Sequence, residues 1–151
     1  MIRPAQYHDI AAMLPLLEQL FTIEADFQFD AVRQRCALEL LLRSPTARVL
    51  VAEWNSRVVA MVTGQLLIST AEGGPALVVE DLVVAKTCQR QGIATRLLEG
   101  LTRWARSRGA HRLQLLADQN NATALEFYRG RDWQNTQLIC LRFRIPEKEE
   151  T

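Results

Sequence analysis

A glycine-containing loop at residues 89–95 joins two segments of different periodicity, and this junction constrains the fold more than any other feature of the chain. Residues 76–84 are rich in Val and Leu, which predicts a buried strand. After the loop, apolar side chains recur at helical spacing as far as about residue 108. A strand, a loop and a helix in this order leave main-chain N–H groups free at the helix N-terminus, where they can bind an anion. We therefore expect a phosphorylated ligand at this loop.

The rest of the chain predicts two further helices before the loop and one after it. Asp9 is expected to cap the first helix, in which Pro15 predicts a kink or an early end. Asp30 is expected to cap the second helix, and residues 121–130 form the last one. β-rich runs predict further strands over residues 2–5, 48–54, 58–68, 111–117 and 133–145, with a tight turn between the second and third of these.

The predicted order of elements is therefore β-α-α-β-β-β-α-β-α-β. Three consecutive strands joined by turns pair antiparallel, whereas the strand–helix–strand connection around Gly92 gives a parallel pair. We predict an α/β (α+β) fold in which a mixed, mostly antiparallel sheet is flanked by helices. The length of 151 residues suits a single domain over residues 1–146, followed by a disordered tail at residues 147–151.

Composition excludes several classes of function. The net charge is +1, and the arginines between residues 90 and 112 fall on the polar side of a helix, so we expect no nucleic-acid partner. No apolar run approaches the roughly 18 residues that span a bilayer, so we expect no membrane segment. The three cysteines are widely separated and predict neither disulfides nor a metal site, which favours a reducing, cytoplasmic setting; they are Cys36, Cys88 and Cys140.

Three motifs occur in a fixed order along the chain. They are Glu80-Asp81-Leu82-Val83-Val84, Gln89-x-x-Gly92-x-Ala94 and Asn121-x-x-Ala124-x-x-Phe127-Tyr128. The loop matches neither the phosphate-binding loop of nucleotide hydrolases nor the dinucleotide-binding fingerprint. In this combination and order, the motifs resemble the GNAT superfamily of acyl-CoA-dependent N-acetyltransferases.

The resemblance implies how coenzyme A would be held. Main-chain amides of the loop would bind its pyrophosphate, and the residues that match are Arg90, Gln91, Gly92, Ile93, Ala94 and Thr95. The preceding strand is splayed from its parallel neighbour in this family, so main-chain groups of Leu82, Val83 and Val84 would pair with the pantetheine arm. One N–H there would face the thioester oxygen. Asn121 would hold the pantetheine end, although it could equally be only the N-cap of its helix. Gln89 departs from the family, which most often has Arg there.

The resemblance also implies the catalytic groups. Tyr128 would lie near the sulfur as a general acid, and Glu80 would be the base that deprotonates the amine, directly or through a water. Asp81 could replace Glu80, but neighbouring residues of a strand face opposite sides unless the strand bulges. Tyr128 could otherwise be a core aromatic, and Glu80 could belong to an ion pair at a strand end.

We therefore predict an N-acetyltransferase that moves an acetyl group from acetyl-CoA to a primary amine. The acceptor would be a small molecule or a peptide, attacking directly in a ternary complex, because no residue resembles an acyl-carrying nucleophile. The alternatives are the same fold with another acyl-CoA, or a non-catalytic CoA-binding regulatory module. Many members of this superfamily dimerise, so the resemblance is compatible with a homodimer. Acidic and aromatic residues at positions 21–29 would either form the acceptor wall or pack in the core.

Overall fold

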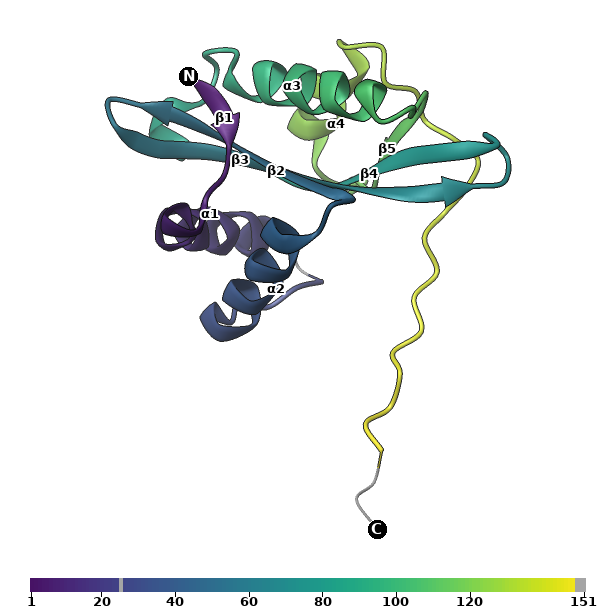
Figure 1. The fold of residues 1–151 in the computed structure, drawn as a ribbon, viewed down its shortest axis with the longest axis horizontal. Coiled ribbons are helices and arrows are strands. Elements are labelled where there is room, and N and C mark those ends of the chain that lie inside the picture. Colours follow the sequence, from purple (N-terminus) through teal and green to yellow (C-terminus); the bar gives the residue numbers. More distant parts are fainter. Residues whose placement is uncertain (25, 149–151) are drawn as a thin grey trace. The chain divides into compact units, whose positions relative to one another are not determined.

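The computed structural model describes residues 1–24 and 26–148. They divide into two compact units, Met1–Leu115 and Leu116–Thr151. Every strand of the described residues lies in the first unit, whereas the second contains a single short helix among them (Figure 1). The single domain predicted over residues 1–146 therefore stays a prediction, and residues 149–151 of the predicted tail lie outside the described residues.

The first unit is built on a five-stranded sheet in which neighbours in sequence are neighbours in space. The strands are β1 (Ile2–Pro4), β2 (Ala47–Trp54), β3 (Arg57–Ser69), β4 (Gly74–Val84) and β5 (Leu113–Leu115). All pairs are antiparallel except β4 with β5, which are parallel and connected through a helix. This arrangement confirms the predicted mixed, mostly antiparallel sheet.

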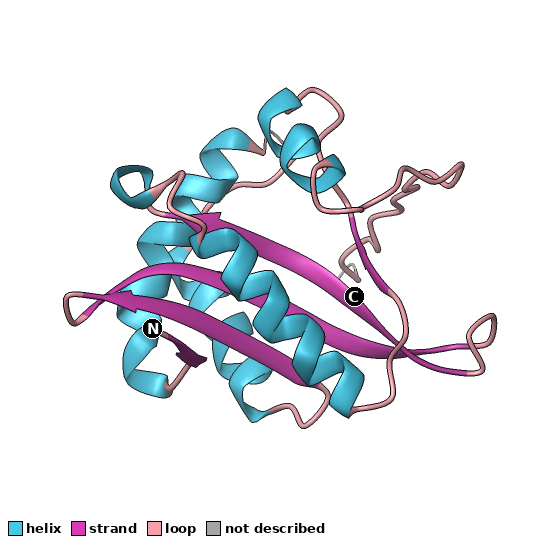
Figure 2. Cartoon of the chain, turned by 90° about the horizontal axis from the view of Figure 1, so that it is seen from above, coloured by secondary structure: helices cyan, strands magenta, loops and turns pink. Residues whose placement is uncertain are grey.

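Helices cover both faces of the sheet, as predicted (Figures 1 and 2). On one face lie α1 (Ile10–Ile23) and α2 (Ala31–Arg43), and on the other lies α3 (Ile93–Ser107). Short 3₁₀ turns precede two of these helices, η1 (Tyr7–Asp9) before α1 and η2 (Lys86–Cys88) before α3. The core under α1 and α2 is formed by buried apolar residues, among them Met13, Leu17, Leu38, Val51, Met61 and Val83.

Local sequence signals explain most element boundaries. The Asp30 side chain accepts from the N–H groups of Val32 and Arg33 at 3.0 and 3.2 Å, which confirms it as the cap of α2. Asn55 and Ser56 both have positive φ, 48° and 59°, as a two-residue hairpin turn between β2 and β3 requires.

Asp9 occupies the N-cap position of α1, but the prediction that its side chain caps the helix was wrong, because its carboxylate accepts from the Gln6 N–H at 2.8 Å and pairs with Arg3 instead. Of the two outcomes predicted for Pro15, the early end does not occur, because α1 continues to Ile23, and the kink stays a prediction. No helix in the described part of the chain is long and apolar enough to cross a membrane.

In the second unit, α4 (Ala122–Arg129) forms as predicted. The strand predicted over residues 133–145 does not form, and residues 137–145 are exposed. Their alternating pattern is that of a strand, but a strand also needs a neighbouring backbone to accept and donate its hydrogen bonds. Within the described residues no strand pairs with this segment, so the pattern alone does not produce the element.

Candidate active site

The glycine loop is shaped to bind an anion through its main chain. Arg90 and Gly92 both have left-handed backbone, with φ of 61° and 76°. Left-handed residues among right-handed ones turn successive N–H groups toward one point, which makes an anion-binding concavity. Gly92 is also the N-cap of α3, whose first intrahelical bond runs from the Arg96 N–H to the Gly92 carbonyl at 3.1 Å.

Open space lies above this loop at Gly92. A Cβ atom added to Gly92 would meet no atom within 4 Å, so a ligand can approach the main chain closely. The next residue, Ile93, is buried and anchors the first turn of α3 in the core. The residues predicted to bind pyrophosphate, from Arg90 to Thr95, thus lie on one loop and one helix start.

The strand that leads into this loop has an open edge. β5 pairs with β4 only at residues 77–79, so residues 80–84 have no strand on that side among the described residues. The Ala85 N–H donates to the Val59 carbonyl at 2.8 Å. Because donors alternate along an antiparallel strand, Val83 also bonds to β3, while the main-chain groups of Leu82 and Val84 face the open edge. Leu82 and the Val84 N–H can bind a ligand as a missing strand would, whereas the Val84 carbonyl already accepts two hydrogen bonds.

Two glutamines stand at the end of this edge. The side-chain amides of Gln19, from α1, and Gln89 both donate to the Val84 carbonyl, at 2.9 and 3.2 Å. Gln89 therefore ties the glycine loop to the strand that precedes it, which gives a physical role to the residue that departs from the family pattern. Nothing in the sequence indicated Gln19, because it lies 65 residues from its partner.

A β-bulge lies next to the open edge and changes which way the carboxylates face. Val62 pairs with Leu82 but Gly64 pairs with Val79, so Thr63 alone stands opposite both Glu80 and Asp81. Two residues opposite one is the definition of a bulge. At the bulge, successive side chains no longer have to alternate between the two faces of the sheet. The carboxylates of Glu80 and Asp81 can therefore lie on the same face.

Both carboxylates lie on the face covered by α1. Glu80 follows Val79, whose cross-strand partner Gly64 faces Leu101 of α3, so Glu80 faces the other side. Asp81 faces the same way, because its carboxylate accepts from the Thr63 hydroxyl at 2.7 Å. The structure therefore brings together the two acids between which the sequence could not choose.

The environment of Asp81 differs from that of Glu80, which is exposed. Burial is the main cause that raises the pKa of Asp81 to about 6; the nearby Glu80 charge contributes to this rise, and the hydrogen bond from the Thr63 hydroxyl opposes it. Thr63 is 1% exposed, and its hydroxyl also accepts from the Asp81 N–H at 3.1 Å. A carboxylate held at this pKa is a better proton acceptor near neutral pH than an ordinary aspartate.

The remaining predicted site residues belong to the second unit. Asn121 caps α4, because its side-chain oxygen accepts from the Ala124 N–H at 3.1 Å, and its amide nitrogen is left to donate elsewhere. The Tyr128 ring lies between two aromatic neighbours, with centroids 5.2 Å from Phe127 and 5.5 Å from Trp133. These contacts fix the ring orientation on α4.

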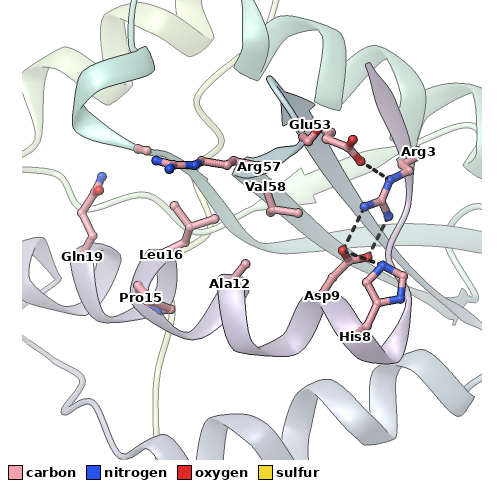
Figure 3. Close-up of a pocket in the computed structure, with 12 residues that line it drawn as sticks. Arg3, His8, Asp9, Ala12, Pro15, Leu16, Gln19, Glu53, Arg57 and Val58 are labelled. Atoms are coloured by element: carbon pink, nitrogen blue, oxygen red, sulfur yellow. Dashed lines mark hydrogen bonds and ion pairs between the residues drawn. The ribbon is translucent and has the colours of Figure 1, made fainter.

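A cavity of about 710 Å³ lies between α1 and the β2–β3 turn (Figure 3). Three of its charged side chains pair with one another, because Arg3 contacts Asp9 at 2.7 and 2.9 Å and Glu53 at 2.9 Å. The hydrogen bonds from Arg3 hold the pKa of Asp9 below its usual value, despite burial. None of the predicted site residues lines this cavity, and Gln19 is its link to the end of β4. The Arg3 cluster therefore joins β1, η1 and β2 rather than supplying catalytic groups.

The acidic and aromatic segment at the end of α1 serves two purposes. Phe21 and Phe29 are partly buried and pack against the core. Phe27 is 38% exposed, with its ring centroid 5.7 Å from that of Phe21. Asp26 is exposed beside it. Core packing thus explains two of the aromatic residues, whereas Phe27 and Asp26 are exposed at the surface.

Comparison with known proteins identifies the family. A sequence profile described as the acetyltransferase (GNAT) family matches residues 12–133. The chain belongs to the acetyltransferase (GNAT) family. The match includes the β4 bulge, the glycine loop and α4, which confirms the resemblance noted from the three motifs. No curated protein sequence matches the chain.

Several solved structures share this fold at low sequence identity. AAC(6')-Iy, an aminoglycoside N-acetyltransferase in complex with CoA, has a TM-score of 0.84 at 14% identity, over 95% of this chain and 93% of that one. An aminoglycoside acetyltransferase from an uncultured soil metagenomic sample has a TM-score of 0.79 at 22% identity, over 97% and 96%. A transcriptional regulator from Bacillus halodurans has a TM-score of 0.84 at 20% identity, over 96% and 99%. At these identities the likeness establishes the fold.

Proposed function

We propose that this GNAT protein is an N-acetyltransferase that moves an acetyl group from acetyl-CoA to a primary amine of a small molecule. One observation carries the proposal. The open edge of β4 leads at one end to a loop with left-handed residues, and at its other end lies a bulge with two carboxylates. An extended cofactor with a pyrophosphate and a reactive thioester fits this order of features.

Coenzyme A supplies an acyl thioester, whose carbonyl carbon reacts with amines. Main-chain amides from Arg90 to Thr95 would bind the pyrophosphate. The main-chain groups of Leu82 and the N–H of Val84, which face the open edge, would pair with the pantetheine arm. The free amide nitrogen of Asn121 would donate to the same arm. The fit rests on the left-handed backbone of the loop, the open space at Gly92 and the part of the β4 edge that pairs with no strand among the described residues.

The acids on the bulge would prepare the amine. An alkylamine with a pKa near 10 is protonated at neutral pH, and only its neutral form attacks a carbonyl carbon. In our proposal Asp81 accepts the proton, and the exposed Glu80 carboxylate holds the ammonium group beside it. Attack would form the carbon–nitrogen bond and break the carbon–sulfur bond of the bound thioester. The Tyr128 hydroxyl would donate a proton to the departing sulfur, and the second proton that the nitrogen loses would restore that hydroxyl.

A small polyamine-like acceptor is the class that we favour. Two of the structural neighbours are aminoglycoside acetyltransferases, which supports a cationic small molecule as the class of acceptor. Asp26 and Phe27 offer a carboxylate and an aromatic ring, a pair that suits an ammonium group.

Thiol release from acetyl-CoA tests the proposal across aminoglycosides, polyamines, amino acids and peptide N-termini. We expect turnover with at least one small cationic amine, and a product heavier by one acetyl group. Propionyl-CoA and succinyl-CoA in parallel reactions test the acyl group. If CoA binds but no amine turns over with any acyl-CoA, the chain is a CoA-binding module and the enzyme proposal fails.

A further inference from the structure

The cavity between α1 and the β2–β3 turn is large enough to hold a small organic ligand (Figure 3). Its volume of about 710 Å³ lies within the roughly 300–1,000 Å³ that is typical of ligand sites. Such sites combine apolar walls with a few polar groups that orient the ligand. The apolar residues that line this cavity are Ala12, Pro15, Leu16, Val58 and Ala85. Its composition is therefore that of a binding site, and its charged residues indicate what it binds.

One charged residue of the cavity lacks a partner within the protein. Arg3 pairs with both Asp9 and Glu53, and the Nε2 atom of His8 lies 3.4 Å from the Asp9 carboxylate. Arg57, by contrast, forms no ion pair with any residue that the structure describes. Figure 3 shows that its side chain extends along the cavity and away from Glu53. The guanidinium of Arg57 is therefore available to a ligand.

The proline inside α1 also belongs to this cavity. Pro15 has no N–H to donate to the carbonyl four residues earlier, and a proline inside a helix lowers its stability for this reason. Residues that break the local rules of their element are found mainly at functional sites. Because Pro15 lines the cavity, its ring gives the cavity a rigid apolar surface. The position of this proline is thus a second observation that points to a ligand.

We propose that this cavity is a second binding site, for a small molecule that has a carboxylate at one end and an apolar body. The guanidinium of Arg57 holds the carboxylate through two parallel hydrogen bonds, and the apolar body packs against α1 and Val58. A carboxylate fits better than a phosphate dianion, because Arg57 supplies one positive charge and the nearby group of one arginine and two acids is negative overall. The site does not depend on the proposed function, since no residue assigned to CoA or to catalysis lines the cavity.

NMR titration of the full ¹⁵N-labelled chain tests the proposal, with 3-phenylpropionate as the probe. We expect saturable shifts of the main-chain amide signals of Ala12, Leu16 and Arg57. The neutral 3-phenylpropionamide and inorganic phosphate should each bind at least roughly tenfold more weakly, because the first lacks the charge and the second lacks the apolar body. Equally tight binding of either one would overturn the proposal. Absence of saturable shifts would overturn it too, as would shifts confined to the glycine loop, because the probe would then occupy the anion site at α3.

Two pairs of variants locate the bound probe. Arg57→Gln should weaken binding of 3-phenylpropionate at least roughly tenfold, as expected from the loss of a charged hydrogen-bonding partner. Arg35→Gln changes an exposed arginine of α2 outside the cavity and should bind the probe like the wild type. Ala12→Leu should weaken binding by a similar factor because its side chain fills the cavity, whereas Ala11→Leu, at an exposed position beside it, should not.

None of these four residues is fully buried, so each variant should keep the circular dichroism spectrum of the wild type. A folded Arg57→Gln protein that binds the probe as tightly as the wild type would contradict the assignment of Arg57 to the carboxylate. A folded Ala12→Leu protein that does so would show that the probe lies outside this cavity.

Discussion

The hydrogen bond between Thr63 and Asp81 offers the sharpest perturbation of the proposed base. Thr63→Val keeps the shape of a side chain that is 1% exposed and removes only the hydroxyl. That hydroxyl donates to the Asp81 carboxylate at 2.7 Å, and so stabilises its charged form. Its loss should therefore raise the pKa of Asp81 above its present value of about 6.

The size of the shift follows from the strength of the bond. A hydrogen bond to a charged group contributes roughly 1.5–3 kcal/mol, and one pKa unit corresponds to about 1.4 kcal/mol. The pKa of Asp81 should then rise by about 1–2 units. The same hydroxyl accepts from the Asp81 N–H, so its removal should also lower the free energy of unfolding by roughly 1–3 kcal/mol.

Two assays measure this shift. Carboxyl ¹³C NMR reports the pKa of Asp81 directly and does not depend on turnover. The pH profile of kcat/KM reports it through catalysis, with one amine used for all variants so that its own ionisation is common to them. Thr63→Ser, which restores the hydroxyl, should return both midpoints toward the wild type. A folded Thr63→Val protein with an unchanged Asp81 pKa would refute the reasoning about the bulge.

Three further substitutions test other parts of the account. Tyr128→Phe should lower kcat roughly a hundredfold or more and leave the affinity for acetyl-CoA, measured by calorimetry, nearly unchanged. An equal decrease in kcat and in this affinity would argue against Tyr128 as the general acid. The pKa of Asp81 in the folded protein lies above the ordinary 3.8, so its ionisation lowers the free energy of unfolding of the wild type between about pH 4 and 6. Asp81→Asn lacks this ionisation, so in urea unfolding its free energy of unfolding relative to the wild type should rise by up to about 3 kcal/mol from pH 4 to 7. A difference between the two proteins that does not depend on pH would contradict this. Gln89→Ala should weaken CoA binding about two- to tenfold, as expected from the loss of one neutral hydrogen bond. An unchanged dissociation constant would argue that the hydrogen bond from Gln89 to Val84 does not hold the loop in position.

Features that depend on a few neighbouring residues could be predicted from the sequence. The Asp30 cap depends on N–H groups two and three residues away, and the Asn55–Ser56 turn depends on two residues that tolerate positive φ. The glycine loop belongs to the same class, because the strand before it and the helix after it have clear periodicities.

The bulge could not be predicted, because it depends on pairing across strands. Glu80 and Asp81 are adjacent in β4, and alternation alone places them on opposite faces. Their common face results from the register shift against Thr63, a residue that lies 18 positions from Asp81. The sequence pattern of each strand alone does not indicate which residue of one strand will pair with two residues of the other.

Asp9 and residues 133–145 show two other limits. Asp9 precedes a helix, as capping residues do, but a bidentate contact with Arg3 competes for its carboxylate. Residues 133–145 have the alternation of a strand, yet a strand forms only beside another backbone. In both cases the local pattern does not determine the structure, which depends also on whether another part of the chain contacts the segment.

Calorimetric titration with CoA tests the central claim most directly, namely that the Gly92 loop and the β4 edge hold this cofactor. We predict one CoA per chain for the wild type, and at least roughly tenfold weaker binding for Gly92→Val, because a side chain would fill the approach to the main chain. Gly73→Val is the matched control, since Gly73 also has positive φ (68°) and open space, but lies in the β3–β4 turn. It should bind CoA like the wild type. A wild type that does not bind CoA, or a folded Gly92→Val that binds it equally well, would contradict the account.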